Sequence, residues 1–162
     1  MVDLVNAETP LTERVVKELH SLVLMNDAKN KGAYRNVEVA IAGATHDLTP
    51  PYFIQEQMEA LLKEYENMKR IKHVIEAIAE FHLRFEGIHP FIDGNGRTGR
   101  LIMNLELVKK GFLPVSIKFT DREKYYECFD SYYSGEHAPD ALTRLILTYE
   151  EEEILRYIKK LS

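Results

Sequence analysis

The stretch His89-Pro-Phe-Ile-Asp-Gly-Asn-Gly-Arg-Thr-Gly-Arg100 combines an imidazole, a carboxylate, a Gly-Asn-Gly turn and two arginines within twelve residues. Glycines allow successive backbone N–H groups to converge on an anion. The periodic apolar residues that follow predict a helix, and the N-terminus of a helix adds its own positive charge. The stretch therefore predicts a phosphate-binding loop between two helices.

Each polar side chain of this stretch suits one task in the chemistry of a nucleotide phosphate. Arg97 and Arg100 are three residues apart, so on a helix they share a face and can bind phosphate oxygens through forked hydrogen bonds. Asp93 is a hard oxygen ligand of the kind that Mg²⁺ prefers. His89 can accept a proton from a hydroxyl near neutral pH. Each residue alone has an ordinary structural explanation, but their occurrence together favours a functional site.

Composition restricts the classes of protein that remain. With 162 residues, 45% of them hydrophobic, the chain is long enough for one sizeable core and short for two domains. A net charge of -5 gives no broad attraction to nucleic acid or to anionic membranes. The single cysteine, Cys128, excludes an internal disulfide and agrees with a reducing compartment, so we expect a cytoplasmic protein. Residues 1–13 lack a signal-peptide pattern, and no window is long enough to cross a bilayer.

Hydrophobic periodicity predicts a mostly helical chain. Helices are expected from Thr12, from Ile54, over about 71–86, from about 95 to 111, from Thr120, and from Asp140 to about 158. The third has the broadest apolar stripe and is expected to be the central helix of a bundle, with His82 as a core residue. The acidic block 150–153 is expected on a solvated face.

One segment changes to a period of two and predicts a short β-hairpin or flap before Pro50-Pro51. It is interrupted at residues 43–47. Two interpretations of this flap stay open, a minor edge hairpin or a template that pairs with an extended segment of a target protein. Its residues are Val37, Glu38, Val39, Ala40, Ile41 and Ala42.

The stretch from His89 to Arg100 resembles the signature of the Fic (filamentation induced by cAMP) domain family along its whole length. The similarity extends from about Thr12 to Ile158, through the Leu19-His20 helix, the Tyr34-Arg35 approach, the flap and the Tyr125-Tyr126 pair. It implies a single Fic domain in residues 1–162, with an all-α bundle and a small β-hairpin flap near the active site. It also implies a protein adenylyltransferase, which moves AMP from Mg-ATP to a Tyr, Thr or Ser hydroxyl of a target protein and releases pyrophosphate.

The resemblance assigns roles to individual positions of this chain. His89 would be the base, Asp93 would hold Mg²⁺ between the α- and β-phosphates, and Phe91 would point into the core. Arg97 would contact phosphate oxygens during transfer, and Arg100 would pair with the γ-phosphate. The residues expected to bind the ATP co-substrate are Gly94, Asn95, Gly96, Arg97, Arg100, Tyr126 and Tyr133. The resemblance places an asparagine that can bond adenine at the position of Tyr133 in several relatives, so this difference concerns which nucleotide base is selected.

The resemblance leaves open how the activity is regulated and whether AMP is added to the target or removed from it. Many Fic proteins are restrained by a helix with Ser or Thr and, four residues later, a Glu that pairs with the second arginine of the motif. Residues 9–13 and 148–152 fit this pattern only loosely, so the helix is expected upstream of Met1, in another chain, or nowhere. A homodimer is left open. Removal of AMP and transfer of another nucleotidyl or phospho group are compatible with the same motif.

Two other functions are weighed against this assignment. A metal phosphohydrolase would use His20, His46-Asp47 and His89 as ligands, but it leaves the Gly-Asn-Gly turn and the arginines unexplained. A nucleotide-binding module without turnover would not need His89.

Overall fold

The computed structural model of the chain describes residues 9–42 and 46–161, and within them it confirms the helical architecture. The helices are α1 (Glu13–Val23), α2 (Ile54–Ile71), α3 (Val74–Ile88), α4 (Asn95–Lys109), α5 (Arg122–Ser134) and α6 (Asp140–Leu161). Short 3₁₀ turns, η2 (Pro51–Phe53) and η3 (Phe119–Asp121), precede α2 and α5. None of the helices in the described ranges is both long and apolar enough to span a membrane.

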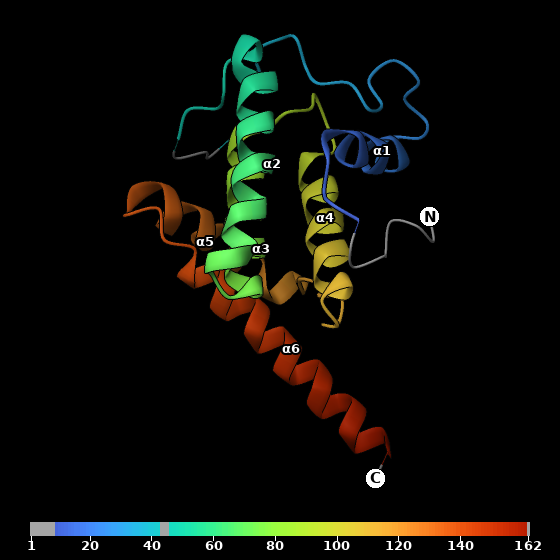
Figure 1. The fold of residues 1–162 in the computed structure, drawn as a ribbon, viewed down its shortest axis with the longest axis vertical. Helices are drawn as coiled ribbons and strands as arrows, with labels where there is room; N and C mark the ends of the chain where they lie inside the picture. The colour runs from blue at the N-terminus through green and yellow to red at the C-terminus, as the bar shows by residue number, and fades with distance from the viewer. Residues whose placement is uncertain (1–8, 43–45, 162) are drawn as a thin grey trace.

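Helix α3 is the centre of the bundle, as its broad apolar stripe predicts. It packs against α2, α4 and α6, while α1 lies against α4 and α5 against α6 (Figure 1). Most of its side chains are buried because neighbours cover it on several sides. The far half of α6 extends away from this bundle toward the C-terminus (Figure 1).

The boundary between α2 and α3 differs from the expected one. Ile71 fits the apolar period of the third helix, but it ends α2 and its side chain is 71% exposed. His73 instead begins α3, because its Nδ1 atom accepts a hydrogen bond from the Ile75 N–H at 3.3 Å. A side-chain cap of this kind satisfies one of the free N–H groups at a helix start.

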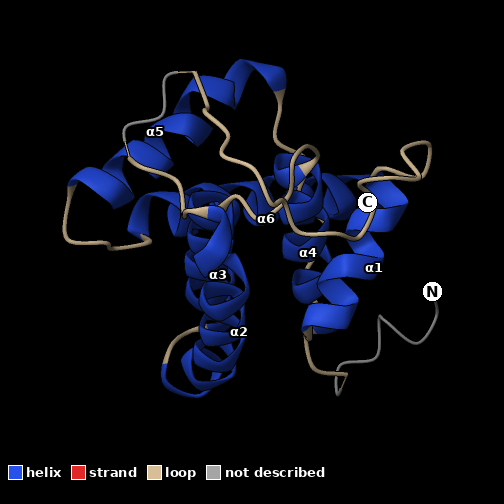
Figure 2. Cartoon of the chain, turned by 90° about the horizontal axis from the view of Figure 1, so that it is seen from above, coloured by secondary structure: helices blue, strands red, loops and turns tan. Residues whose placement is uncertain are grey.

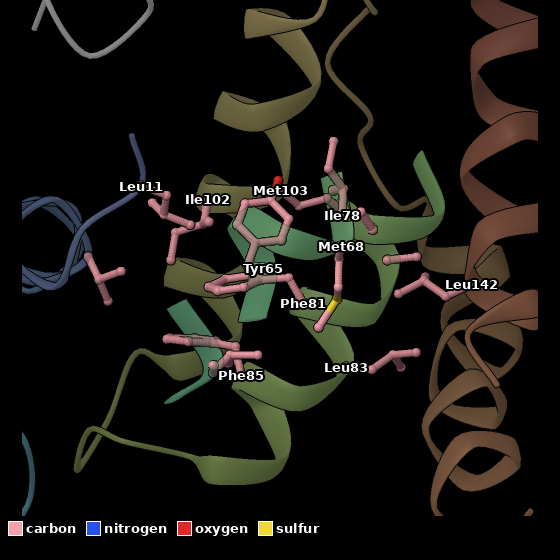
Figure 3. Close-up of a cluster of buried hydrophobic side chains, with 14 of the residues drawn as sticks. Leu11, Tyr65, Met68, Ile78, Phe81, Leu83, Phe85, Ile102, Met103 and Leu142 are labelled. Atoms are coloured by element: carbon pink, nitrogen blue, oxygen red, sulfur yellow. The ribbon is translucent and has the colours of Figure 1, made fainter. Parts of the chain in front are cut away.

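The core joins residues from all parts of the described chain. Tyr65 from α2, Phe81 and Phe85 from α3, Ile102 from α4 and Leu142 from α6 lie in one buried cluster (Figure 3). A buried polar group within it is satisfied, since Glu106 accepts hydrogen bonds from the Tyr65 hydroxyl at 2.9 Å and from the Lys109 ammonium at 2.8 Å. Because buried charges destabilise a core unless they are paired, this triad keeps the α2–α4 contact intact.

The predicted β-hairpin flap is wrong for the residues that the structure describes. Residues Val37, Glu38, Val39, Ala40, Ile41 and Ala42 form no strand, and Figure 2 draws the segment as a loop. Of the predicted interruption at 43–47, residues 43–45 lie outside the described residues.

The side chain of Arg35 gives the physical reason why this segment forms no strand. Arg35 donates hydrogen bonds to the carbonyls of Val37 at 2.9 Å and Thr49 at 2.5 Å, so its guanidinium bridges the two arms of the segment. An isolated two-stranded hairpin is at best marginally stable in water. The alternating sequence therefore yields a loop without a backbone ladder, with a bend at Val37 and a turn at Ala42.

The acidic block of α6 also differs from the expectation of a solvated face. Glu150 is buried, and its Oε2 atom accepts a hydrogen bond from the Leu113 N–H at 3.1 Å. Burial raises the pKa of this carboxyl above its ordinary value. Glu150 thus anchors the segment after α4 to α6, while Glu151 stays exposed.

Candidate active site

The loop between α3 and α4 turns through a left-handed residue at each end. His89 ends α3 with φ 52° and ψ 61°, and its N–H donates to the Phe85 carbonyl at 3.0 Å. Gly94 begins α4 with φ 77°, a conformation that suits glycine. A Cβ atom at Gly94 would lie 3.2 Å from the side chain of Val23, so α1 also packs closely against this turn.

Asn95 holds the loop closed from the inside. Its Oδ1 atom accepts the Phe91 N–H and its Nδ2 atom donates to the Phe91 carbonyl, both at 2.8 Å. The side chain is buried, and these bonds employ both of its polar atoms. Asn95 therefore contributes its backbone N–H, rather than its carboxamide, to any anion bound at the start of α4.

His20 fixes the same loop from the side of α1. Its Nδ1 atom accepts the Gly32 N–H at 2.8 Å, so the ring proton is on Nε2 and is donated to the Asp93 carbonyl at 3.0 Å. The ring stacks on Phe91, with centroids 3.6 Å apart. Burial lowers the pKa of His20, which keeps this imidazole neutral. Phe91 is fully buried, which confirms the expectation that it points into the core.

Arg35 holds the backbone that carries His89. Its Nε atom donates to the His89 carbonyl at 2.8 Å, and its own N–H donates to the Pro90 carbonyl at 2.9 Å. The sequence marks the Tyr34-Arg35 approach only as a family landmark, because the carbonyls of His89 and Pro90 that Arg35 binds lie more than fifty residues away. An arginine among mainly polar, glycine-containing neighbours gives no sequence signal for this role.

The imidazole of His89 is poised as a neutral base. Its Nδ1 atom is shielded from solvent, and a backbone hydrogen bond with Glu86 acts on the ring. Burial and the positive charge of Arg35 lower the pKa of His89 to about 4. The ring therefore stays unprotonated near neutral pH and has a free nitrogen lone pair that can accept a proton.

His89 lines a cavity of about 510 Å³ that also reaches the start of α4. The other lining residues come from α3, α4, α5 and the flap segment: Glu86, Gly96, Arg100, Tyr125, Tyr126, Phe129, Asp130, Ile41, Ala42 and His46. A base and a guanidinium thus face one space large enough for a small-molecule ligand.

The start of α4 supplies the positive side of this cavity. The first N–H groups of a helix have no acceptor within it, and here they belong to Asn95, Gly96 and Arg97. The guanidinium of Arg100 folds back over Gly96, where an added Cβ would lie only 3.1 Å from its Nη1 atom. Gly96 therefore gives Arg100 room to reach the helix start, and together they form an anion site.

Asp93 and Arg97 lie at the exposed rim of the same turn. Asp93 Oδ1 accepts the Gly94 N–H at 2.6 Å, and its Oδ2 atom lies 3.3 Å from Arg97. Their side chains are 71% and 53% exposed, so this ion pair is weak and easily exchanged for other partners. No set of three metal-ligating side chains gathers in the described ranges. A single accessible carboxylate fits Mg²⁺, which binds few protein ligands and keeps phosphate and water oxygens.

The two tyrosines predicted for the base lie in different places. Tyr126 is half-exposed on α5, lines the cavity and accepts a hydrogen bond from Arg122 at 3.3 Å. Tyr133 lines a second cavity, where its hydroxyl donates to the Leu83 carbonyl at 3.0 Å. Its ring stacks on His46, with centroids 3.8 Å apart, and His46 lines both cavities. Tyr133 thus contacts the wall of the first cavity through His46.

Fold and site together define a helical domain with an anion-binding helix start beside a neutral imidazole. Residues 10–107 match the sequence pattern of the Fic/DOC family. The chain belongs to the Fic/DOC family.

Individual relatives agree with this membership. The chain is 35% identical to a protein adenylyltransferase Fic of Nematostella vectensis over 161 residues, which cover 96% of the chain and 36% of the relative. It is 42% identical to a probable protein adenylyltransferase of Aquifex aeolicus over 92 residues, which cover 57% of the chain and 28% of the relative. It thus spans only about a third of the length of these relatives.

The solved structures show the same fold. Fic-1 of Caenorhabditis elegans superposes with a TM-score of 0.80 at 30% identity, covering 94% of the chain and 44% of Fic-1.

Proposed function

We propose that this chain transfers AMP from Mg-ATP to a Tyr, Thr or Ser hydroxyl of a target protein and releases pyrophosphate. One observation carries the proposal: the neutral imidazole of His89 and the guanidinium of Arg100 line the same cavity at the start of α4. The names of the relatives support it. We assign the activity to residues 12–158 as a single domain, and we place the protein in the cytoplasm because a chain with one cysteine does not depend on an internal disulfide.

The chemistry needs a base, an anion site and an in-line hydroxyl. His89 accepts the proton of the hydroxyl, whose oxygen then bonds to the α-phosphorus while the bond to the bridging oxygen of pyrophosphate breaks. The N–H groups of Gly96 and Arg97 and the guanidinium of Arg100 stabilise the negative charge that develops. Asp93 holds Mg²⁺, which neutralises phosphate charge when it is bound. Tyr126 covers the adenine, and Tyr133 supports that wall through His46.

The flap segment would hold the target. Val37 and Ile41 are exposed apolar side chains of this segment, Ile41 lines the cavity, and the segment has no strand beside it among the described residues. An incoming peptide could pair with it as an added strand.

Two loosely matching helix patterns do not reach Arg100. Glu13 binds Lys17 and Gln55, and Glu152 binds Lys118 at 2.6 Å. A restraining helix or a second copy of the chain therefore remains a proposal about partners.

The decisive experiment uses ATP labelled at either the α- or the γ-phosphate. Purified chain with Mg²⁺ should acquire α-label and one AMP mass on itself or on an added lysate protein, and His89→Ala should abolish this. Incorporation from the γ-position alone would contradict AMP transfer and indicate phosphorylation. Release of AMP from a modified protein, without labelling from ATP, would show that the chain removes AMP instead of adding it.

A further inference from the structure

A second titratable group lies at the floor of the cavity. Glu86 is on α3 and shares a helix face with His82, four residues earlier, while His89 directly follows the helix. Its carboxyl lines the cavity together with Arg100 and Gly96. A carboxylate in an anion site is unexpected, because it repels the phosphates that the arginine attracts.

The carboxyl of Glu86 has no partner on one side. Its Oε1 atom is shielded from solvent and accepts no hydrogen bond from the described residues. No ion pair joins it to Arg100 within the described ranges, although the positive charge of Arg100 lowers its pKa. The close approach of α4 at Gly99 creates this environment, since a Cβ there would lie 2.6 Å from Oε1.

Arg100 is oriented by a different group. Its guanidinium donates a hydrogen bond to the Tyr125 hydroxyl, and that hydroxyl lies 2.7 Å from Nε2 of His82. Both partners are buried. The arginine is therefore directed toward the cavity, and Glu86 stays beside it as an uncompensated carboxyl.

Burial dominates the titration of Glu86 and raises its pKa to about 7. The groups that face it are His82 and His89 on its own helix, Arg100 on α4, and Tyr125, Tyr133 and Asp130 on α5, with His46 across the cavity. Burial lowers the pKa of His82 and of His89 to about 4, so neither titrates in the same range. Burial also raises the pKa of Tyr125 and Tyr133.

We propose that Glu86 is a positioning residue of the nucleotide site, which takes up one proton when a nucleoside triphosphate binds beside Arg100. This inference rests on the proposed function. The carboxylate becomes a carboxylic acid, with the proton supplied by solvent. The neutral acid no longer repels the phosphate, which the guanidinium of Arg100 then binds. The bound triphosphate adds negative charge to the cavity and so holds the proton in place.

Linkage gives the size and sign of the effect. Because the complex binds one proton more than the free protein, affinity falls as pH rises through the pKa of free Glu86. With that pKa at about 7, the dissociation constant should rise about tenfold between pH 6 and pH 8. Glu86→Gln keeps the shape of a neutral acid and should bind with the low-pH affinity at every pH.

The test is isothermal titration of a non-hydrolysable ATP analogue with excess Mg²⁺ at pH 6, 7 and 8. Buffers of different ionisation enthalpy should reveal uptake of about one proton by the wild type at pH 8 and none by Glu86→Gln. Glu76→Gln, a change at a half-exposed position on the same helix, is the matched control and should behave as wild type. Thermal unfolding of each variant reports whether it folds.

Three outcomes would overturn the assignment of Glu86. These are equal pH dependence of wild type and Glu86→Gln, no pH dependence in either, or weaker binding by a folded Glu86→Gln at pH 7. Absence of analogue binding at pH 6 by the wild type would instead reject the proposed nucleotide site, and the role of Glu86 with it.

Discussion

The loop 89–94 and the described residues of the flap region, 36–42 and 46–50, border the same cavity but are built in opposite ways. The loop is fixed by Asn95 and Phe91 from within, by His20 from α1, and by Arg35 from the flap side. The flap segment is held at its ends by Arg35 and at His46 by stacking on Tyr133. A loop fixed this way is preorganised for phosphate chemistry. Residues 37–42 form no strand pairing of their own, which is why we propose this segment as the place where a target pairs.

His89→Ala should cause the largest change and tests the chemical role of the loop. Loss of a general base costs about 10²–10⁴-fold in turnover. Affinity for the ATP analogue should stay within a few-fold, because the anion site lies on α4. AMP incorporation and analogue titration measure the two effects. Near-normal AMP transfer by His89→Ala would show that the imidazole is not the base.

Arg35→Met tests the link between the two regions. It leaves the carbonyls of His89, Val37 and Thr49 without their donor, so the free energy of unfolding should fall by about 3 kcal/mol. Denaturant unfolding measures this loss. A second consequence distinguishes the link from bulk stability: AMP transfer should fall even under conditions where the variant is folded. Full activity would show that the loop keeps its shape without Arg35.

Asn95→Ala should destabilise the chain by about 2 kcal/mol, because it leaves the buried N–H and carbonyl of Phe91 unpaired. Asn104→Ala is its matched control. Asn104 makes the same pair of bonds to the N–H and carbonyl of Val115, at 2.7 and 2.9 Å, outside the loop. Similar losses in unfolding free energy are expected, with AMP transfer reduced only by Asn95→Ala. Equal losses of AMP transfer in the two variants would show that the bonds of Asn95 contribute to activity no more than the corresponding bonds of Asn104.

Ala40→Pro should have the smallest effect on the fold. Proline removes one backbone N–H from an exposed position, so the free energy of unfolding should change by less than about 0.5 kcal/mol. If a target pairs with this segment, its modification should fall several-fold while analogue binding is unchanged. Ala40→Ser is the control that retains the N–H. Unaltered modification of a protein target by Ala40→Pro would leave the flap segment as a simple connection.

The sequence predicts the helices well because apolar periodicity records which face each helix buries. The predicted strand was wrong because alternation at Val37, Val39 and Ile41 indicates an extended backbone but not a neighbour to pair with. The boundary at His73 was missed because an imidazole is an uncommon cap. In each case the structure depends on a contact with another residue, and the local sequence pattern does not show which residue that is.

The motif residues were brought to one loop as expected, but two contributors were not foreseen. Arg35 depends on carbonyls far along the chain. Glu86 carries a local signal, since it shares a helix face with His82, yet only the approach of α4 at Gly99 shows that it is shielded. Asn95 was expected at the anion, and its side chain serves the loop.

The left-handed backbone conformation of His89 is energetically unfavourable for a residue with a Cβ atom. Residues with a Cβ lose roughly 1–2 kcal/mol there, and glycine loses nothing comparable. His89→Gly should therefore melt at a higher temperature than His89→Ala, although both lack the ring. The backbone of this turn is least strained in a variant that lacks the imidazole and is inactive. The reactive residue is therefore kept at a position where it costs conformational energy.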